Sequence, residues 1–267
     1  MKYKILVLLT CHAEKDCIKD TIENILKFNK DTAIVINNGI FTDNLNEFTA
    51  ENVHIVPRND IYNWDCSFFS LIPLHVDLWD YIIQNDIQAE YIITLSSNQL
   101  FIRHNIYDFM KWFDASQFGR RVPDNISENI HIDDSFSKNY IDDLGKTSFI
   151  YQSNHDGMFY KWEVFSNMMK YFEDHRGRYI NWTSEEYLYP AWLVKNIPEQ
   201  NITKFSTYNY FHLVDYNLYD PNAVWFNSLR GLNVDDVKDC IFKGMYIVKR
   251  IDKVYDNDAR TFIRSLT

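Results

Sequence analysis

Glycine and cysteine are scarce in this sequence. Seven glycines among 267 residues argue against a repetitive glycine-rich architecture. No GxGxxG motif follows the first apolar run, and the P-loop motif GxxxxGKS/T is absent, so a dinucleotide-binding dehydrogenase and a P-loop nucleotidase are poor fits. The four cysteines are scattered, with no CxxC pair and no histidine at zinc-finger spacing. We expect free thiols in a reducing compartment and no structural zinc.

The sequence also lacks an excess of positive charge and has no long apolar run. The 27 basic side chains are outnumbered by 37 acidic ones, so the formal charge is −10 and no broad basic face is available for nucleic acid or anionic lipid. The first apolar run, 5–9, is too short for a signal sequence or a membrane span. We therefore expect a cytoplasmic protein with no nucleic-acid partner and no integral membrane segment, and leave peripheral membrane association open.

Short apolar runs alternate with helical patterns along the chain. Hydrophobic residues make up 46 % and aromatics 16 %, which excludes disorder. We expect strands at 3–9, 33–36, 53–56, 90–95 and 149–151, and further strands near 202–214 and 244–251 that complete the sheet. We expect helices at 18–26, 67–83, 106–113 and 163–172, and a loop at 119–148. This pattern predicts a single α/β domain over 1–267, with a mixed, mostly parallel sheet and helices on both faces.

Polar residues directly follow several predicted strands. Because ligands bind at the carboxyl ends of parallel strands, we expect these residues to meet at one edge of the sheet. They are His12 after the first strand, Asn37 and Asn38 after the second, Arg58 after the third, and Ser96, Ser97 and Asn98 after the central strand 90–95. The turn His155-Asp156-Gly157 is a further candidate, whose side chains either face a substrate or only shape the turn.

The end of the central strand carries no metal-binding motif. A metal-dependent sugar transferase needs an Asp-x-Asp there to hold a divalent ion against a diphosphate, and this chain has Ser96-Ser97-Asn98 instead. We interpret the one Asp-x-Asp of the sequence, Asp256-Asn257-Asp258, as a helix N-terminus, and we expect no metal cofactor. Lys249 and Arg250 end an apolar run, and they either bind phosphate or form an ordinary solvated pair.

The run 182–190 places two adjacent carboxylates among aromatic side chains. Trp182, Tyr187 and Tyr189 all lie within five positions of Glu186. Partial desolvation raises the pKa of a carboxylate toward neutral pH, which suits a general base. Thr183 followed by Glu186 also fits a capping box, in which the glutamate only closes a helix start. The two interpretations are compatible, because a capping box fixes the geometry of its glutamate.

Four stretches of the sequence, taken in order, resemble the motifs of a known family. They are the first strand with His12; Pro57-Arg58 followed by Trp64 and Ser67; Tyr91-Ile92-Ile93-Thr94-Leu95-Ser96-Ser97-Asn98; and Thr183-Ser184-Glu185-Glu186-Tyr187-Leu188. This order resembles the core-2/I-branching β-1,6-N-acetylglucosaminyltransferases and the related peptide O-xylosyltransferases. The fourth stretch is the most specific, since that family places its base in an acidic-Glu-Tyr-Leu segment that matches Glu186. The family usually has a glycine and an acidic residue where this chain has Ser97-Asn98, and often an acidic residue at Asn37-Asn38.

The resemblance implies a GT-A type, Rossmann-like fold and an inverting, metal-independent transfer of a sugar from a nucleotide sugar, expected to be a UDP-sugar, to a glycan hydroxyl. Surface polysaccharide, lipopolysaccharide or glycoprotein glycan would be the product, and Glu186 the catalytic base. We expect donor contacts from His12, Asn37, Asn38, Arg58, Lys249 and Arg250. We expect acceptor contacts from Ser97, Asn98, Asp156 and Trp64.

Two alternatives fit the same residues. One is a non-catalytic carbohydrate-binding or scaffold protein on the same fold, in which Glu186 serves only as a cap. The other is a metal-dependent nucleotidyltransferase with a GT-A-like fold. Nucleotide binding separates the first alternative from a transferase, and the effect of a chelator separates the second.

Overall fold

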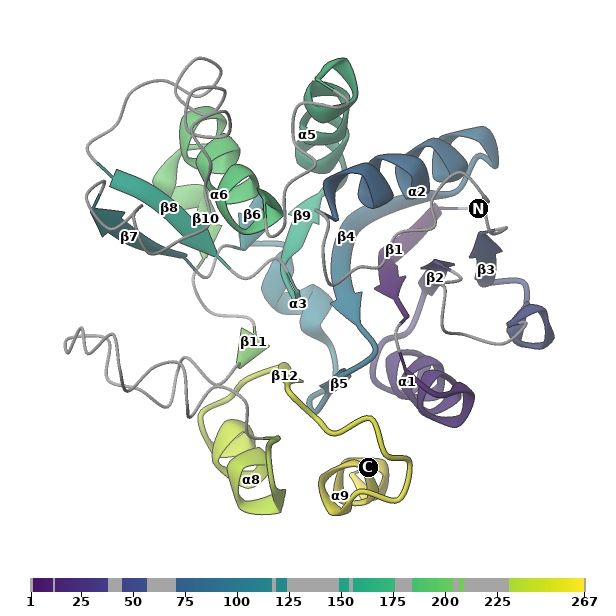
Figure 1. The fold of residues 1–267 in the computed structure, drawn as a ribbon. Helices are drawn as coiled ribbons and strands as arrows, with labels where there is room; N and C mark the ends of the chain where they lie inside the picture. The colour runs from purple at the N-terminus through teal and green to yellow at the C-terminus, as the bar shows by residue number, and fades with distance from the viewer. Residues whose placement is uncertain are drawn as a thin grey trace.

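The computed structural model describes residues 2–11, 13–37, 45–56, 71–116, 119–123, 149–153, 156–175, 184–203, 207–208 and 231–266. Their main sheet has seven strands in the order β10-β6-β9-β4-β1-β2-β3 (Figure 1). The strands are β1 (Lys2–Thr10), β2 (Thr32–Asn37), β3 (Val53–Val56), β4 (Gln88–Ser96), β6 (Ala115–Ser116), β9 (Phe159–Lys161) and β10 (Ile202–Thr203).

The sheet is mostly parallel. β4, β1, β2 and β3 are parallel neighbours, as are β6 and β10, whereas β9 runs antiparallel to both β4 and β6. Residues 5–9 are at most 1 % exposed, as expected for a central strand that is covered on both faces. The predicted α/β class with a mixed, mostly parallel sheet is therefore confirmed.

Helices cover both faces of this sheet, as predicted (Figure 1). Leu6 and Leu8 of β1 share one core with α2 (Ile72–Gln84), α5 (Trp162–Asp174) and α6 (Ser184–Asn196). Ile5, Val7 and Leu9 share the opposite core with α1 (Lys15–Phe28) and α3 (Ile106–Met110). This division follows from the alternation of side chains along a strand. Pro73 is tolerated because it lies in the first turn of α2.

A second, three-stranded sheet corrects one prediction. β5 (Gln99–Phe101), β12 (Ile247–Lys249) and β11 (Thr207–Tyr208) form it in the order β11-β12-β5, so the strand near 244–251 does not complete the main sheet. The chain leaves β4, turns, and offers β5 as an antiparallel partner to β12. The helices α8 (Val234–Phe242) and α9 (Asp258–Ser265) pack against these strands. The sequence pattern did not predict α8.

The stretch expected to be a loop contains a strand. β7 (Gly119–Pro123) pairs antiparallel with β8 (Phe149–Ser153), so the expectation is wrong for 119–123, and 124–148 lie outside the described residues. Two short 3-10 helices are Asn46–Phe48 and Glu199–Asn201. The helix interpretation of Asp256-Asn257-Asp258 is confirmed, because the Asn257 side chain caps α9 by accepting from Ala259 N and Arg260 N. Within the described residues, no helix is both long and apolar enough to span a membrane.

Candidate functional site at the carboxyl end of β4

Three strands of the main sheet end together. The register pairs Thr10 of β1 with both Asn37 of β2 and Ser96 of β4. The backbone N–H of Ser97 also donates to Thr10 O at 3.1 Å, which ties the turn after β4 to the end of β1. Thr10 and Ser96 are buried and Asn37 is partly exposed. The carboxyl ends of β1, β2 and β4 therefore meet at one edge of the sheet, as expected, and Asn37 lies at this edge.

The turn after β4 is held by a side-chain cluster. Gln99 Oε1 accepts from Ser96 N at 2.8 Å and from Ser96 Oγ at 3.1 Å, and Ser96 Oγ lies 2.6 Å from Asn98 Oδ1. Because a backbone N–H can only donate, these bonds fix which amide atom of Gln99 is the oxygen. Gln99 Nε2 is then a buried donor without a hydrogen-bond partner in the part of the chain that is described. Sequence reasoning missed Gln99, since nothing in its neighbours marks it.

A buried ion pair lies beside this cluster. Lys249 is directly opposite Gln99 in the β5–β12 register, and its Nζ donates to Asp156 Oδ2. The two side chains are each 11 % exposed. Asp156 precedes Gly157, whose φ of 75° favours glycine and whose N–H donates to Thr94 O at 2.6 Å. We expected Lys249 to contact the sugar donor and Asp156 to contact the acceptor. The structure instead joins the two side chains in one ion pair.

The α6 segment reaches the same edge through Glu185. In a β3-α2-β4 crossover between parallel strands, the helix begins at the carboxyl ends of the strands. Glu185 Oε2 accepts from Leu71 N, at the start of α2, at 3.0 Å, and Glu185 is only 4 % exposed. The first turn of α6 therefore meets the first turn of α2, and the positive ends of both helix dipoles favour the Glu185 carboxylate.

Glu186 occupies the next position of α6, but its side chain lies outside the described part of the structure. The helix begins at Ser184, where the capping-box pattern predicted a helix start. Thr183 is not among the described residues, so the capping box itself stays a prediction. Pro190 has no N–H to donate to Glu186 O, so the first turn of α6 lacks one regular helix bond.

Buried aromatic hydroxyls continue the polar region from α6 toward Asp156. Tyr189 Oη lies 2.8 Å from His75 Nδ1. The pKa of Tyr189 is raised well above its ordinary value, mainly by burial and further by the nearby Tyr160 and Glu185. Burial also raises the pKa of Tyr160, partly offset by a hydrogen bond with the Thr94 side chain, while Asp156 raises it further. Both phenols therefore stay protonated and neutral at physiological pH.

The later cations divide into buried and surface groups. Arg260 is fully buried and donates to Asp20 Oδ2 at 2.6 Å, to Ser97 O at 2.8 Å and to Asp252 O at 2.7 Å. It therefore supports the turn after β4 and is not available to a ligand. Arg250 is partly exposed, has a φ of 76°, and its carbonyl accepts from Leu232 N.

The remaining predicted residues are only partly placed. His12, Asn38, Arg58 and Trp64 lie outside the described residues. Ser97 has no exposed surface, so an acceptor cannot reach its side chain in this arrangement, whereas Asn98 is partly exposed. Among the described residues, no three His, Cys, Asp or Glu side chains gather as a metal site would require, and metal independence stays a prediction.

Comparison with known proteins adds no family assignment. No protein-family model matches this sequence, and no curated protein matches it either.

Proposed function

We propose that the protein is an inverting glycosyltransferase of GT-A type that transfers a sugar from a nucleoside-diphosphate sugar to a glycan hydroxyl without a metal ion. One observation carries the proposal. The carboxyl end of β4 holds the ammonium of Lys249 beside the Gln99–Ser96 cluster, and the α6 turn with two adjacent carboxylates meets the same edge through Leu71. A donor site and a base are the two parts that such a reaction requires.

In the proposed reaction, Glu186 accepts the proton of the acceptor hydroxyl as the hydroxyl oxygen attacks the anomeric carbon. The bond from that carbon to the diphosphate oxygen breaks in the same step, and the configuration at the carbon inverts. General-base assistance of this kind contributes about 10²–10⁴-fold. Glu185 is not assigned this role, because its carboxylate already accepts from Leu71 N.

Lys249 is assigned to the leaving diphosphate. An ammonium group has three N–H donors, and one of them is directed at Asp156 Oδ2. Asp156 thereby holds the ammonium in place, where it would donate to a phosphate oxygen of the leaving group. Gln99, the opposed residue, has no exposed surface, so we assign it to holding the turn after β4 through Ser96 and not to contact with the diphosphate. Because the Lys249–Asp156 pair is neutral as a whole, we assign diphosphate binding to hydrogen bonds more than to net charge.

Nucleotide binding tests this assignment. We expect UDP, and less strongly GDP or CMP, to raise the melting temperature of the wild-type protein, because a ligand that binds only the folded state stabilises it. Replacing Lys249 alone removes the ammonium that balances the buried Asp156 carboxylate, so the informative variant is the double change Lys249→Met with Asp156→Asn. It should bind UDP at least about tenfold more weakly, which is the loss of one charged hydrogen bond.

The matched control is Lys243→Met. Lys243 is an exposed lysine that directly follows α8 and pairs with Asp239 of that helix. Its shift with UDP should equal that of the wild type. If none of the three nucleotides moves the wild-type melting temperature, the protein has no donor site, and the non-catalytic alternative is the better account.

A further inference from the structure

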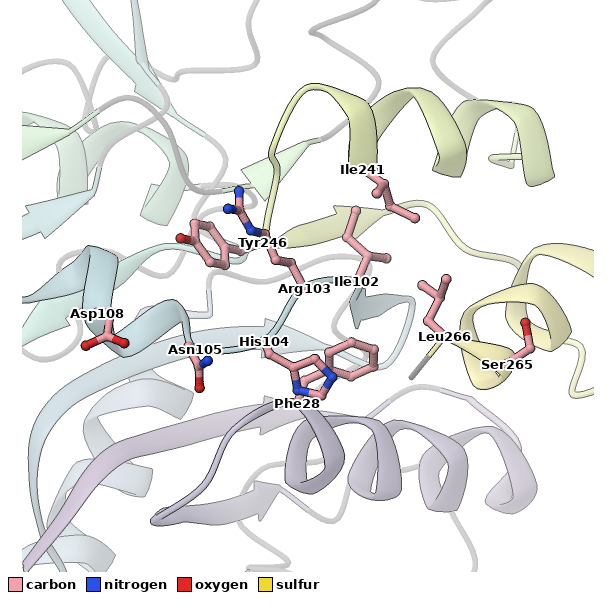
Figure 2. A pocket seen from close by; sticks show the side chains of 10 residues that line it. All are labelled: Phe28, Ile102, Arg103, His104, Asn105, Asp108, Ile241, Tyr246, Ser265 and Leu266. Atoms are coloured by element: carbon pink, nitrogen blue, oxygen red, sulfur yellow. The ribbon is translucent and has the colours of Figure 1, made fainter.

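A cavity lies apart from the ends of the main-sheet strands. It has a volume of about 670 Å³ and opens between the end of α1, the loop before α3, the turn between α8 and β12, and the end of α9 (Figure 2). Pockets for small ligands usually measure about 300–1,000 Å³. The cavity is not lined by the residues of the proposed transfer site, which are Ser96, Gln99, Asp156 and Lys249. A ligand held there would therefore occupy a place separate from the proposed sugar-donor site.

One side of the cavity is apolar. Ile102 of the loop, Ile241 of α8 and Leu266 after α9 converge on it from three separate segments (Figure 2). Phe28 lies below them with the His104 ring at 4.5 Å, and the exposed His104 covers the phenyl group. Ile241 is 37 % exposed, so part of this apolar surface faces solvent. The wall can accept a short aliphatic or aromatic group.

The other side carries a positive charge held in a fixed place. The Arg103 guanidinium lies 5.0 Å from the centroid of the Tyr246 ring and donates through one N–H to Gly244 O at 3.0 Å. Gly244 has a φ of 75°, and a Cβ there would lie 3.1 Å from Arg103 Nη1, so glycine leaves room for the guanidinium. Arginine has five N–H donors, which leaves several for a ligand.

The acidic groups near the cavity do not neutralise Arg103. Asp108, the carboxylate of the lining, forms an ion pair with Lys111 at 3.0 Å. Within the described residues no carboxylate forms an ion pair with Arg103, and Lys27, beside Phe28, donates to the carbonyls of Arg264 and Leu266. In a chain of formal charge −10, the cavity therefore presents a guanidinium that pairs with no described carboxylate, while its one lining carboxylate is paired with Lys111.

We propose that this cavity binds a small organic anion, in which a phosphate or carboxylate group is attached to a short apolar body. The anionic group accepts hydrogen bonds from Arg103, whose planar fork suits two oxygens of such a group. The apolar body packs against Ile241 and Leu266. The proposal is independent of the sugar-transfer reaction, since it uses none of the residues at the end of β4.

Calorimetric titration with phenyl phosphate tests the proposal on the full chain. We expect one saturable site, and binding at least tenfold weaker for inorganic phosphate and for phenol, each of which carries half of the recognised chemistry. Benzoate in a parallel titration distinguishes a carboxylate from a phosphate ligand. An unchanged affinity in the presence of UDP shows that phenyl phosphate does not occupy the proposed donor site.

Variants assign the binding to the cavity. Arg103→Gln should weaken phenyl phosphate about tenfold, the scale of one charged hydrogen bond at an exposed site. Ile241→Gln should weaken phenyl phosphate without changing inorganic phosphate. Lys19→Gln removes an equal charge from the exposed face of α1 and should leave both unchanged. Equal affinity of wild type and Arg103→Gln, or no saturable binding by the wild type, overturns the proposal.

Discussion

Glu186→Gln should lower kcat/KM for sugar transfer by about 100-fold or more. The amide keeps the shape of the glutamate but cannot accept the proton of the acceptor hydroxyl, and general-base catalysis is worth about 10²–10⁴-fold. The measurement is the initial rate of nucleoside-diphosphate release with acceptor present, for wild type and variant at equal concentration. A rate within threefold of the wild type means that Glu186 is not the base.

Glu185→Gln is the matched control at the adjacent position. Its amide oxygen can still accept from Leu71 N, but the charged hydrogen bond becomes a neutral one at the meeting point of two helix N-termini. We expect the free energy of unfolding to fall by about 1–2 kcal/mol and the transfer rate to stay within threefold. The reverse result, with the rate lost in Glu185→Gln and retained in Glu186→Gln, would assign the base to Glu185.

Asp20→Asn should lower the free energy of unfolding by about 3–5 kcal/mol, which is the usual cost of leaving one partner of a buried ion pair uncompensated. Arg260 is fully buried, Asp20 is 3 % exposed, and Arg264 Nη1 lies 3.5 Å from the same carboxylate. The amide removes the charge that balances Arg260 while keeping the volume. Urea unfolding measures the change as a lower midpoint at constant slope.

Glu23→Gln on the same helix is the control for this stability effect. Glu23 pairs with Lys19 at 3.9 Å, with both side chains more than half exposed. A surface pair of this kind is worth less than about 1 kcal/mol. If the two variants lose equal stability, Arg260 does not depend on Asp20. Because Arg260 also donates to Ser97 O, we expect Asp20→Asn to weaken nucleotide binding as well.

The sequence predicts the central part of the fold well, because parallel strands covered on both faces have continuous apolar runs. The strand expected at 53–56 is β3, and the run 90–95 lies inside β4. Elements that depend on a distant partner were missed. β5 has only three residues, and it directs β12 away from the main sheet through a pairing between Gln99 and Lys249. β7 likewise depends on β8, which follows it after 25 residues that lie outside the described part.

The candidate site was predictable as an edge but not as a set of contacts. Parallel topology alone places Asn37 and Ser96 at neighbouring strand ends. Asp156 and Lys249 are separated by 93 positions in sequence, and no local pattern shows that they form an ion pair. Successive positions of a helix differ in direction by about 100°, so the adjacent pair of glutamates in the sequence does not reveal that Glu185 packs against the start of α2.

The most direct test of the proposed transfer is the release of UDP from a panel of UDP-sugars by the wild-type protein, with and without EDTA. The account predicts turnover of at least one donor at a rate that EDTA does not change, because the proposed role of Lys249 is to take the place of a metal at the diphosphate. Activity abolished by EDTA and restored by manganese would contradict it and favour a metal-dependent transferase.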